Sequence, residues 1–164
     1  MKLALAQAAK SLQRDDFPVG AILAINGRII DKARNTRHSK KNWGSHAETV
    51  LLIKNSALIA RQQEQDKSTD VQLYTTLEPC LMCLGGAFLH RVDRIIFGCP
   101  DPRGGALGLQ KKGLPSFYKD HWPKITGGVL REESYDMLMK FMVKKDTVQW
   151  RKNVKLFEAM KKSR

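Results

Sequence analysis

Two short polar motifs, each at the start of a helix pattern, constrain the fold more than any other feature. The first is "HAE", residues His46 to Glu48, and the second is "PCLMC", which runs from Pro79 to Cys83. Two cysteines in C-x-x-C spacing lie one helical turn apart, so both thiolates can reach one ion from a helix N-terminus, where the helix dipole favours the charged form. A histidine from a neighbouring helix N-terminus would complete a three-ligand zinc site. The pattern therefore requires the two helices to begin side by side.

The first part of the chain reads as a helix, a hairpin and a second helix. Apolar residues at helical spacing predict a helix over 2–14, and Asn26-Gly27 predicts a tight turn between two strands within 19–35. The near-continuous apolar run "AILAI" indicates a strand buried on both faces. A helix is expected over 45–63, with Ser45 as its N-cap and Glu48 completing a capping box.

Strands and helices continue to alternate in the second part. The patterns predict strands at 71–77, at 93–99 and within 122–130, and helices over 80–91, 131–145 and 146–164, with a Gly/Pro-rich loop at 100–117. This order implies an α/β fold, a three-layer α/β/α sandwich with a mixed five-stranded central sheet. We expect one domain over residues 1–164, with 146–164 as a basic C-terminal helix.

Composition favours a cytoplasmic enzyme. The 164 residues are 42% hydrophobic and 27% charged, and no apolar run approaches the roughly 20 residues of a membrane span. The N-terminus lacks the apolar core and the small-residue cleavage site of a signal peptide. Three cysteines, an odd number, argue against a disulfide framework and for a reducing compartment.

The charge balance points to the class of partner. A formal net charge of +13 attracts polyanions, nucleic acid first. A solvated surface of lysines is the alternative interpretation. The charge does not identify a reaction.

A catalytic zinc site is a better interpretation of the two motifs than a structural one. Structural zinc sites are closed by four protein ligands, whereas catalytic sites leave one position open, and the sequence offers no convincing fourth ligand. Glu48 follows His46 by two residues and can stand beside the open position as a proton shuttle. Taken singly, "HAE" could be a helix cap and the cysteine pair a redox or structural motif. Together they match the H-x-E and P-C-x-x-C pattern of zinc deaminases.

At these residues the chain resembles the cytidine deaminase superfamily, and it is most similar to its bacterial tRNA adenosine deaminases. The similar blocks are "PVGAIL", "ARN", "HAE", "LYTTLEPCLMCLGGA", "RIIFGCPDPRGGALG" and "ITGGVLREE". The resemblance implies a homodimeric deaminase of cytidine deaminase-like fold that converts the wobble adenosine of a tRNA anticodon loop to inosine. It also implies one Zn²⁺ on His46, Cys80 and Cys83, and proton transfer by Glu48.

The same resemblance implies contacts to the substrate. Asn35 would hydrogen-bond the target nucleoside, backbone around Ala47 and Pro79 would lie close to the reacting base, and Asp101 would contact the nucleic acid at the mouth of the site. Trp150 either covers the substrate or packs the last helix against the body, since aromatic side chains are usually buried.

Several residues depart from the tRNA deaminase pattern. Ser45 precedes His46 where a small apolar residue is usual, and Leu109 follows Gly108 where serine is common. The tail around Trp150 resembles that of cytosine deaminases with a small free-base pocket. A deaminase of a small nucleobase or nucleoside, cytosine or guanine, is therefore the alternative. A catalytically silent nucleic-acid-binding protein is a third, which Glu48 argues against.

Overall fold

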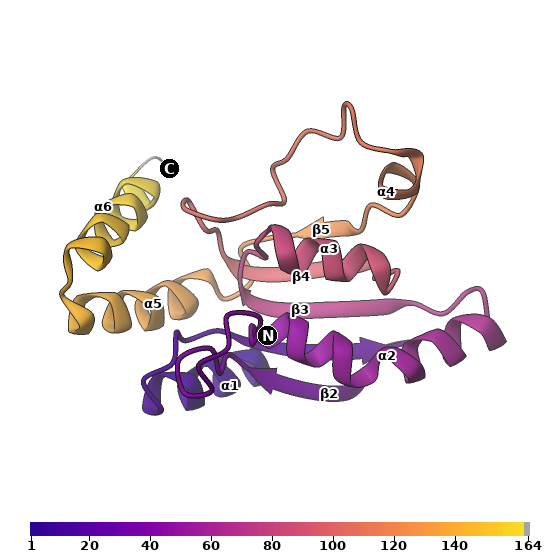
Figure 1. Cartoon of the computed structure of the whole chain (residues 1–164), viewed down its shortest axis with the longest axis horizontal. Coiled ribbons are helices and arrows are strands. Elements are labelled where there is room, and N and C mark those ends of the chain that lie inside the picture. Colours follow the sequence, from indigo (N-terminus) through magenta and orange to yellow (C-terminus); the bar gives the residue numbers. More distant parts are fainter. Residues whose placement is uncertain (163–164) are drawn as a thin grey trace.

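The computed structural model describes residues 1–162, which form a sheet between two layers of helices (Figure 1). Ser163 and Arg164, the end of the helix expected over 146–164, lie outside the described residues. The elements are α1 (Lys2–Gln13), β1 (Gly20–Ile25), β2 (Arg28–Arg34), α2 (Ala47–Gln65), β3 (Val71–Leu77), α3 (Leu81–Leu89), β4 (Arg94–Cys99), α4 (Ser116–Asp120), β5 (Lys124–Thr126), α5 (Arg131–Lys145) and α6 (Val148–Lys162).

The sheet has five strands in the order β2-β1-β3-β4-β5. β1 is antiparallel to both of its neighbours, and β3, β4 and β5 are parallel to one another, so the expected mixed sheet is confirmed. The turn between β1 and β2 is formed by Asn26 (φ 51°) and Gly27 (φ 76°), both in the left-handed region that a two-residue hairpin requires. All six residues of β1 are buried, as expected for a strand covered on both faces.

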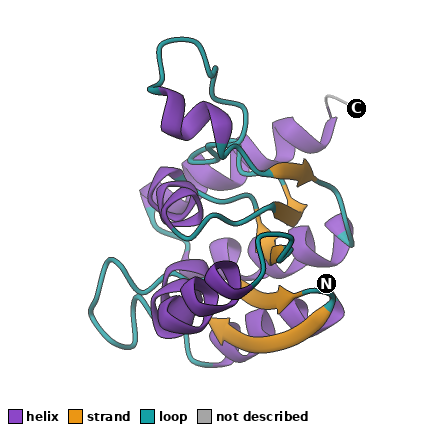
Figure 2. Cartoon of the chain, turned by 90° about the vertical axis from the view of Figure 1, so that its right-hand side faces the viewer, coloured by secondary structure: helices purple, strands orange, loops and turns teal. Residues whose placement is uncertain are grey.

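Helices cover both faces of the sheet. α2 and α3 pack side by side on one face, and α1 and α5 pack on the other (Figures 1 and 2). The central strands and both helix layers contribute fully buried side chains, among them Leu23, Leu51, Leu73, Leu84, Ile95 and Leu138. The three-layer sandwich is confirmed. α6 follows α5 after a turn at Asp146 (φ 40°) and packs chiefly on α5.

Two local expectations were wrong. The capping box of Ser45 and Glu48 does not form: the N-cap of α2 is His46, and the Glu48 carboxylate turns into the molecule, where Thr75 Oγ1 donates to its Oε1 at 3.1 Å. Within the part of the chain expected to be a loop, α4 begins at Ser116. Its five residues are too few to show a helical period.

The sequence contains no apolar run long enough to predict a membrane span, and the helices of the structure can be compared with that expectation. In residues 1–162 no helix combines the length and the apolar character that a membrane crossing requires.

Candidate metal centre

The starts of α2 and α3 carry the two polar motifs. His46 is the N-cap of α2, Cys80 is the N-cap of α3, and Cys83 lies one turn further along α3. Because α2 and α3 pack against each other on one face of the sheet, their first turns meet. The structure therefore brings together the three residues expected to be ligands.

The geometry of this cluster fits one zinc ion. Cys80 Sγ and Cys83 Sγ are 3.7 Å apart, and His46 Nδ1 is 3.6 Å from the first sulfur and 3.5 Å from the second. Tetrahedral zinc with ordinary Zn–S and Zn–N bonds would separate its ligand atoms by about 3.8 Å for S···S and about 3.5 Å for S···N. Within residues 1–162 no other cluster of His, Cys, Asp and Glu has this compactness. One imidazole and two thiols are a donor set that zinc prefers.

The two thiols are in hydrogen-bond contact, and this contact shifts their pKa values in opposite directions. The hydrogen bond between Cys80 and Cys83, together with one involving His46, lowers the pKa of Cys80 to about 4 although burial opposes the shift. The hydrogen bond with Cys80, and burial, raise the pKa of Cys83, while the hydrogen bond with Cys80 raises the pKa of His46. Both sulfurs must be thiolates to coordinate a metal, so binding of Zn²⁺ would release any proton that the pair of thiols carries.

Glu48 lies on the first turn of α2 with its side chain inside the molecule. Its residue is 3% exposed, and burial raises the pKa of its carboxyl group. Thr75, on β3, holds the carboxylate through the 3.1 Å hydrogen bond. A buried carboxylate with one fixed orientation is suited to accept and return a proton.

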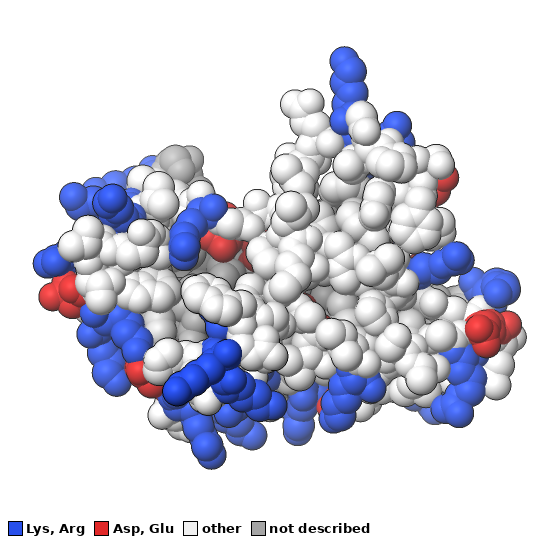
Figure 3. All heavy atoms as spheres, viewed as in Figure 1, with Lys and Arg blue, Asp and Glu red and all other residues white. Residues whose placement is uncertain are grey.

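A cavity of about 360 Å³ adjoins the cluster. Its wall includes His46, Glu48 and Cys80, and Figure 3 shows a hollow between α6 and the loop after β4. The remaining wall residues are Phe17, Val19, Asn35, Arg37, Leu77, Glu78, Asp101, Arg103, Gly104, Met142, Trp150, Asn153 and Phe157.

Of the expected substrate contacts, Asn35, Asp101 and Trp150 line this cavity. Asn35 is 3% exposed and its Oδ1 accepts from Arg37 N–H at 2.9 Å, which leaves the Nδ2 group to donate to a ligand.

Asp101 and Trp150 each also have a structural contact. Asp101 Oδ1 accepts from Arg103 N–H at 2.9 Å. The Trp150 ring stacks on Phe17 with centroids 5.6 Å apart, so this side chain both packs α6 and faces the cavity.

Ala47 and Pro79 are buried and are not part of the cavity wall. Ala47 separates His46 from Glu48, and Pro79 immediately precedes Cys80. The Pro79 carbonyl accepts from Ala106 N–H at 3.0 Å, which ties the loop after β4 to the start of α3.

Sequence reasoning missed Glu78, which fixes the loop after β4. Its Oε2 accepts from Asp101 N–H and its Oε1 from Leu107 N–H, both at 3.1 Å. A Cβ on Gly105 would lie 2.4 Å from the Glu78 carboxyl carbon, so a larger residue there would push this carboxylate away from the two N–H groups that it accepts. A carboxylate two residues before Cys80 was the available signal.

Asn153 on α6 was also missed. It is 2% exposed, lines the cavity and accepts at Oδ1 from Gln149 Nε2 at 3.3 Å. A polar residue on the apolar side of the last helix, next to Phe157, was the signal for it.

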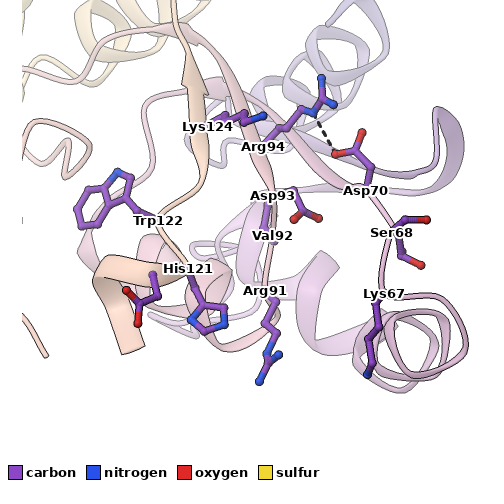
Figure 4. Close-up of a pocket in the computed structure, with 12 residues that line it drawn as sticks. Lys67, Ser68, Asp70, Arg91, Val92, Asp93, Arg94, His121, Trp122 and Lys124 are labelled. Carbon is purple, nitrogen blue, oxygen red and sulfur yellow. Dashed lines mark hydrogen bonds and ion pairs between the residues drawn. The ribbon is translucent and has the colours of Figure 1, made fainter. Parts of the chain in front are cut away.

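A second, more polar groove lies at the opposite end of the sheet (Figure 4). Lys67, Arg91, Asp93 and Lys124 border it, and Arg94 pairs with Asp70 at 3.0 Å. It touches the first residues of β4, whereas the cavity touches the last residue of β3. The two strands are parallel, so about 20 Å of sheet separates this groove from the candidate metal centre.

Comparison with known proteins places this centre in a family. A family model described as the cytidine and deoxycytidylate deaminase zinc-binding region matches residues 1–99. The tRNA-specific adenosine deaminase of Bacillus subtilis (strain 168) is 38% identical over 141 residues, which are 86% of this chain and 85% of the relative. That of Haemophilus influenzae is 33% identical over 99% of this chain and 90% of its own length.

Solved structures agree with these relatives. A structure from a study of A-to-I editing by tRNA:A34 deaminases at the wobble position is 31% identical, with a TM-score of 0.70 over 84% of this chain and 97% of the other. A guanine deaminase from Nitrosomonas europaea has a TM-score of 0.67 at 19% identity over 85% of this chain and 81% of the other, which shows the shared fold. The chain therefore belongs to the cytidine and deoxycytidylate deaminase family and is a zinc-dependent hydrolytic deaminase.

Proposed function

We propose that the protein deaminates adenosine to inosine at the wobble position of a tRNA anticodon loop. The observation that carries this proposal is the likeness to tRNA-specific adenosine deaminases, 33% identical over 99% of the chain in one case. The whole chain, residues 1–164, would act as one catalytic domain in the cytoplasm, where tRNA is found.

Each residue of the candidate centre has a role in this reaction. His46, Cys80 and Cys83 would hold Zn²⁺, which when bound would supply Lewis-acid activation of the water that attacks C6 of adenine. Glu48 would take a proton from that water and give it to the ring nitrogen N1. It would then take the proton of the new C6 hydroxyl group and give it to the amino group, which leaves as ammonia while the C6 carbonyl forms. Asn35 donates from Nδ2 to the nucleoside and sets its orientation, which supplies much of the rate.

Further residues shape the site around the target. Trp150 forms part of the cavity wall, and Asp101 would contact the nucleic acid at its mouth. Ala47 and Pro79 would support the base indirectly, because they lie behind the wall next to His46, Glu48 and Cys80, which line it. A cavity of about 360 Å³ accommodates one base rather than a stacked strand, so the target must be splayed out of the loop.

Positive charge at the rim of the cavity favours a polyanionic substrate. Arg37 and Arg103 both line it, and among residues 1–162 neither guanidinium is within ion-pair distance of a carboxylate. Lys and Arg side chains also gather over α6 and over the loop between β2 and α2 (Figure 3). Phosphate contacts of this kind predict RNA binding that weakens steeply as salt concentration rises.

Deamination of a free nucleobase is the second candidate. α6 forms one wall of the cavity with Trp150, Asn153 and Phe157, an arrangement suited to enclosing a small base. One assay separates the two: the protein is incubated with a tRNA anticodon stem-loop and, in parallel, with cytosine, guanine and nucleosides. Inosine in the RNA supports the proposal, whereas ammonia from a free base with no inosine in RNA contradicts it.

The role of Glu48 has its own test. Glu48→Gln should bind one equivalent of zinc and lose deamination by about 10²-fold or more, since general acid–base catalysis contributes that much. Undiminished turnover would refute the proton shuttle. A protein that only binds RNA would show the same RNA affinity with Glu48 replaced and no turnover in either form.

We also propose that the protein is a homodimer through α2 and α3. These helices expose Ile53, Leu81, Met82 and Leu89, with Leu89 71% exposed, and Figure 3 shows little charge over α3. Exposed apolar side chains clustered on one face indicate an interface. Sedimentation should find a dimer for the wild type and a monomer for Leu89→Asp; the exposed Leu156→Asp on α6 should remain dimeric.

A further inference from the structure

We propose that a cleft beside the catalytic cavity, lined by Phe17, Arg37, Trp43 and Trp150, binds the nucleotide adjacent to the target base. The adjacent base would stack on the exposed tryptophan, and its phosphate would contact the arginine. This inference rests on the proposed action on RNA and adds a second subsite to it.

The cleft adjoins the catalytic cavity directly. It has a volume of about 550 Å³, enough for a nucleotide, and Phe17, Arg37 and Trp150 line both spaces. The other residues of its wall are Asp15, His38, Lys41, Asn42, Trp43, Phe141 and Lys145. A base held in the cavity would therefore place the next nucleotide of its strand at the cleft.

The aromatic side chains of the cleft differ in how firmly they are held. Trp150 stacks on Phe17 at an interplanar angle of 24° and meets Phe141 edge-on at 5.3 Å, so it forms a fixed wall. Trp43 is 76% exposed. The Arg37 guanidinium lies 3.7 Å from the Trp43 ring centroid and covers one of its faces. Such an exposed aromatic platform beside a cation is what single-stranded nucleic acid binds by stacking.

The charges around the cleft fit a phosphate. Arg37, Lys41 and Lys145 carry positive charge at its wall, and Asp15 is the one carboxylate there. Asp15 is already paired with Lys145. Arg37 is thus left to bind an anion, and RNA offers one at each nucleotide next to a stackable base.

The loop that carries Arg37 and Trp43 is held in place by Asp16. This buried carboxylate accepts from His38 N–H and Ser39 N–H, both at 2.8 Å, and from Ser39 Oγ–H at 2.6 Å. The backbone that follows Arg37 is therefore preorganised, which reduces the entropy that binding would cost.

The experiment measures kcat/KM on an anticodon stem-loop with each flanking nucleotide either intact or abasic. For the wild type, the abasic change on one side of the target should cost about 5- to 150-fold, the range for loss of one base–aromatic stack. Trp43→Ala should lose the same factor on the intact substrate and become insensitive to that abasic change. Trp43→Phe should restore most of the difference.

Two further variants check charge and specificity. Arg37→Ala should reduce kcat/KM and flatten its salt dependence, whereas Arg61→Ala, an exposed arginine on α2, should do neither. Because Trp43 is largely exposed, its variants should melt at the wild-type temperature.

The outcomes separate this inference from the proposed function. If wild-type protein makes no inosine in the RNA, the proposed function and this subsite both fail. If the wild type does so and Trp43→Ala matches it, or loses activity equally on intact and abasic substrates, the subsite alone is refuted. If Trp43→Ala deaminates RNA at the wild-type rate but no longer binds a protein that the wild type binds, Trp43 would belong to a protein-docking surface instead.

Discussion

Replacing Asp16 with Asn should be strongly destabilising although the two side chains have almost the same size. The Asp16 side chain is fully buried, and it accepts four hydrogen bonds. Oδ1 accepts from two backbone N–H groups, those of His38 and Ser39, in the loop between β2 and α2. Oδ2 accepts from Arg34 Nη1 at 3.0 Å and from Ser39 Oγ. An amide NH₂ in either position would face groups that also donate.

The expected cost follows from these contacts. The Ser39 hydroxyl can rotate and accept from the new NH₂ group, but the Arg34 guanidinium cannot accept, so its charge-assisted hydrogen bond is lost. The hydrogen bonds that remain are weaker, because their acceptor is no longer a charged carboxylate. At about 1.5–3 kcal/mol for a bond to a charged group, the free energy of unfolding should fall by about 2–4 kcal/mol. For a chain of this length that lowers the melting temperature by about 5–15 °C.

The effect should depend on pH. Burial raises the pKa of Asp16, but the hydrogen bonds from Ser39, Arg34 and His38 outweigh it, and the pKa lies below its ordinary value of 3.8. The ionised group therefore stabilises the fold above about pH 4, and this contribution is lost as pH falls through the folded-state pKa. The gap between wild type and Asp16→Asn should be constant near neutrality and shrink in acid.

Urea unfolding followed by tryptophan fluorescence, at fixed zinc concentration, measures the gap. Asp31→Asn is a matched control, because Asp31 also accepts from a cation, Lys54 at 2.8 Å, but its side chain is 18% exposed and its partner 68% exposed. It should cost less than about 1 kcal/mol. Equal losses in the two variants, or a loss under about 0.5 kcal/mol for Asp16→Asn, would refute the reasoning.

Two other substitutions test the surroundings of the metal. Gly105→Ala should lower the free energy of unfolding by about 1–3 kcal/mol and also lower kcat, because the new Cβ would meet the carboxylate of Glu78 at 2.4–2.6 Å. Gly108→Ala is the control, since nothing lies within 4 Å of its Cβ position, and it should melt at the wild-type temperature. Equal melting temperatures for the two variants would count against the close approach at Gly105. Cys83→Ala should bind well below one equivalent of zinc, as measured by elemental analysis. Cys99→Ala, which removes a buried thiol outside the cluster, should keep its zinc. Full zinc content in Cys83→Ala would show that Cys83 is not a zinc ligand.

Much of the fold was predictable because its signals are local. The Asn26-Gly27 turn, the fully apolar strand before it and the helix over 131–145 all depend on residues that are neighbours in sequence, and the structure confirms them. The C-x-x-C pair is local in the same sense, since one helical turn determines its spacing. The fold class and the metal donor set could therefore be predicted mainly from the order of the apolar patterns and from the spacing of the polar motifs.

The missed features depend on contacts between distant segments. Glu48 satisfies a local capping rule, but a hydrogen bond from Thr75 on β3 holds it inward. Asp16 looks like an ordinary turn residue after α1, yet its partners begin 18 residues later at Arg34. Asn153 reaches the cavity only because α6 turns back after Asp146. No periodicity in the sequence encodes these approaches.

The arrangement of α6 separates two tasks within the protein. The groups that would activate water and move protons lie on α2 and α3, which are packed into the sandwich, whereas Trp150, Asn153 and Phe157 approach the cavity from a helix that packs chiefly on α5. A different sequence for the last helix could change which base fits without disturbing the reactive groups. Exchanging this segment between relatives is therefore a direct way to redesign substrate choice on an unchanged reaction centre.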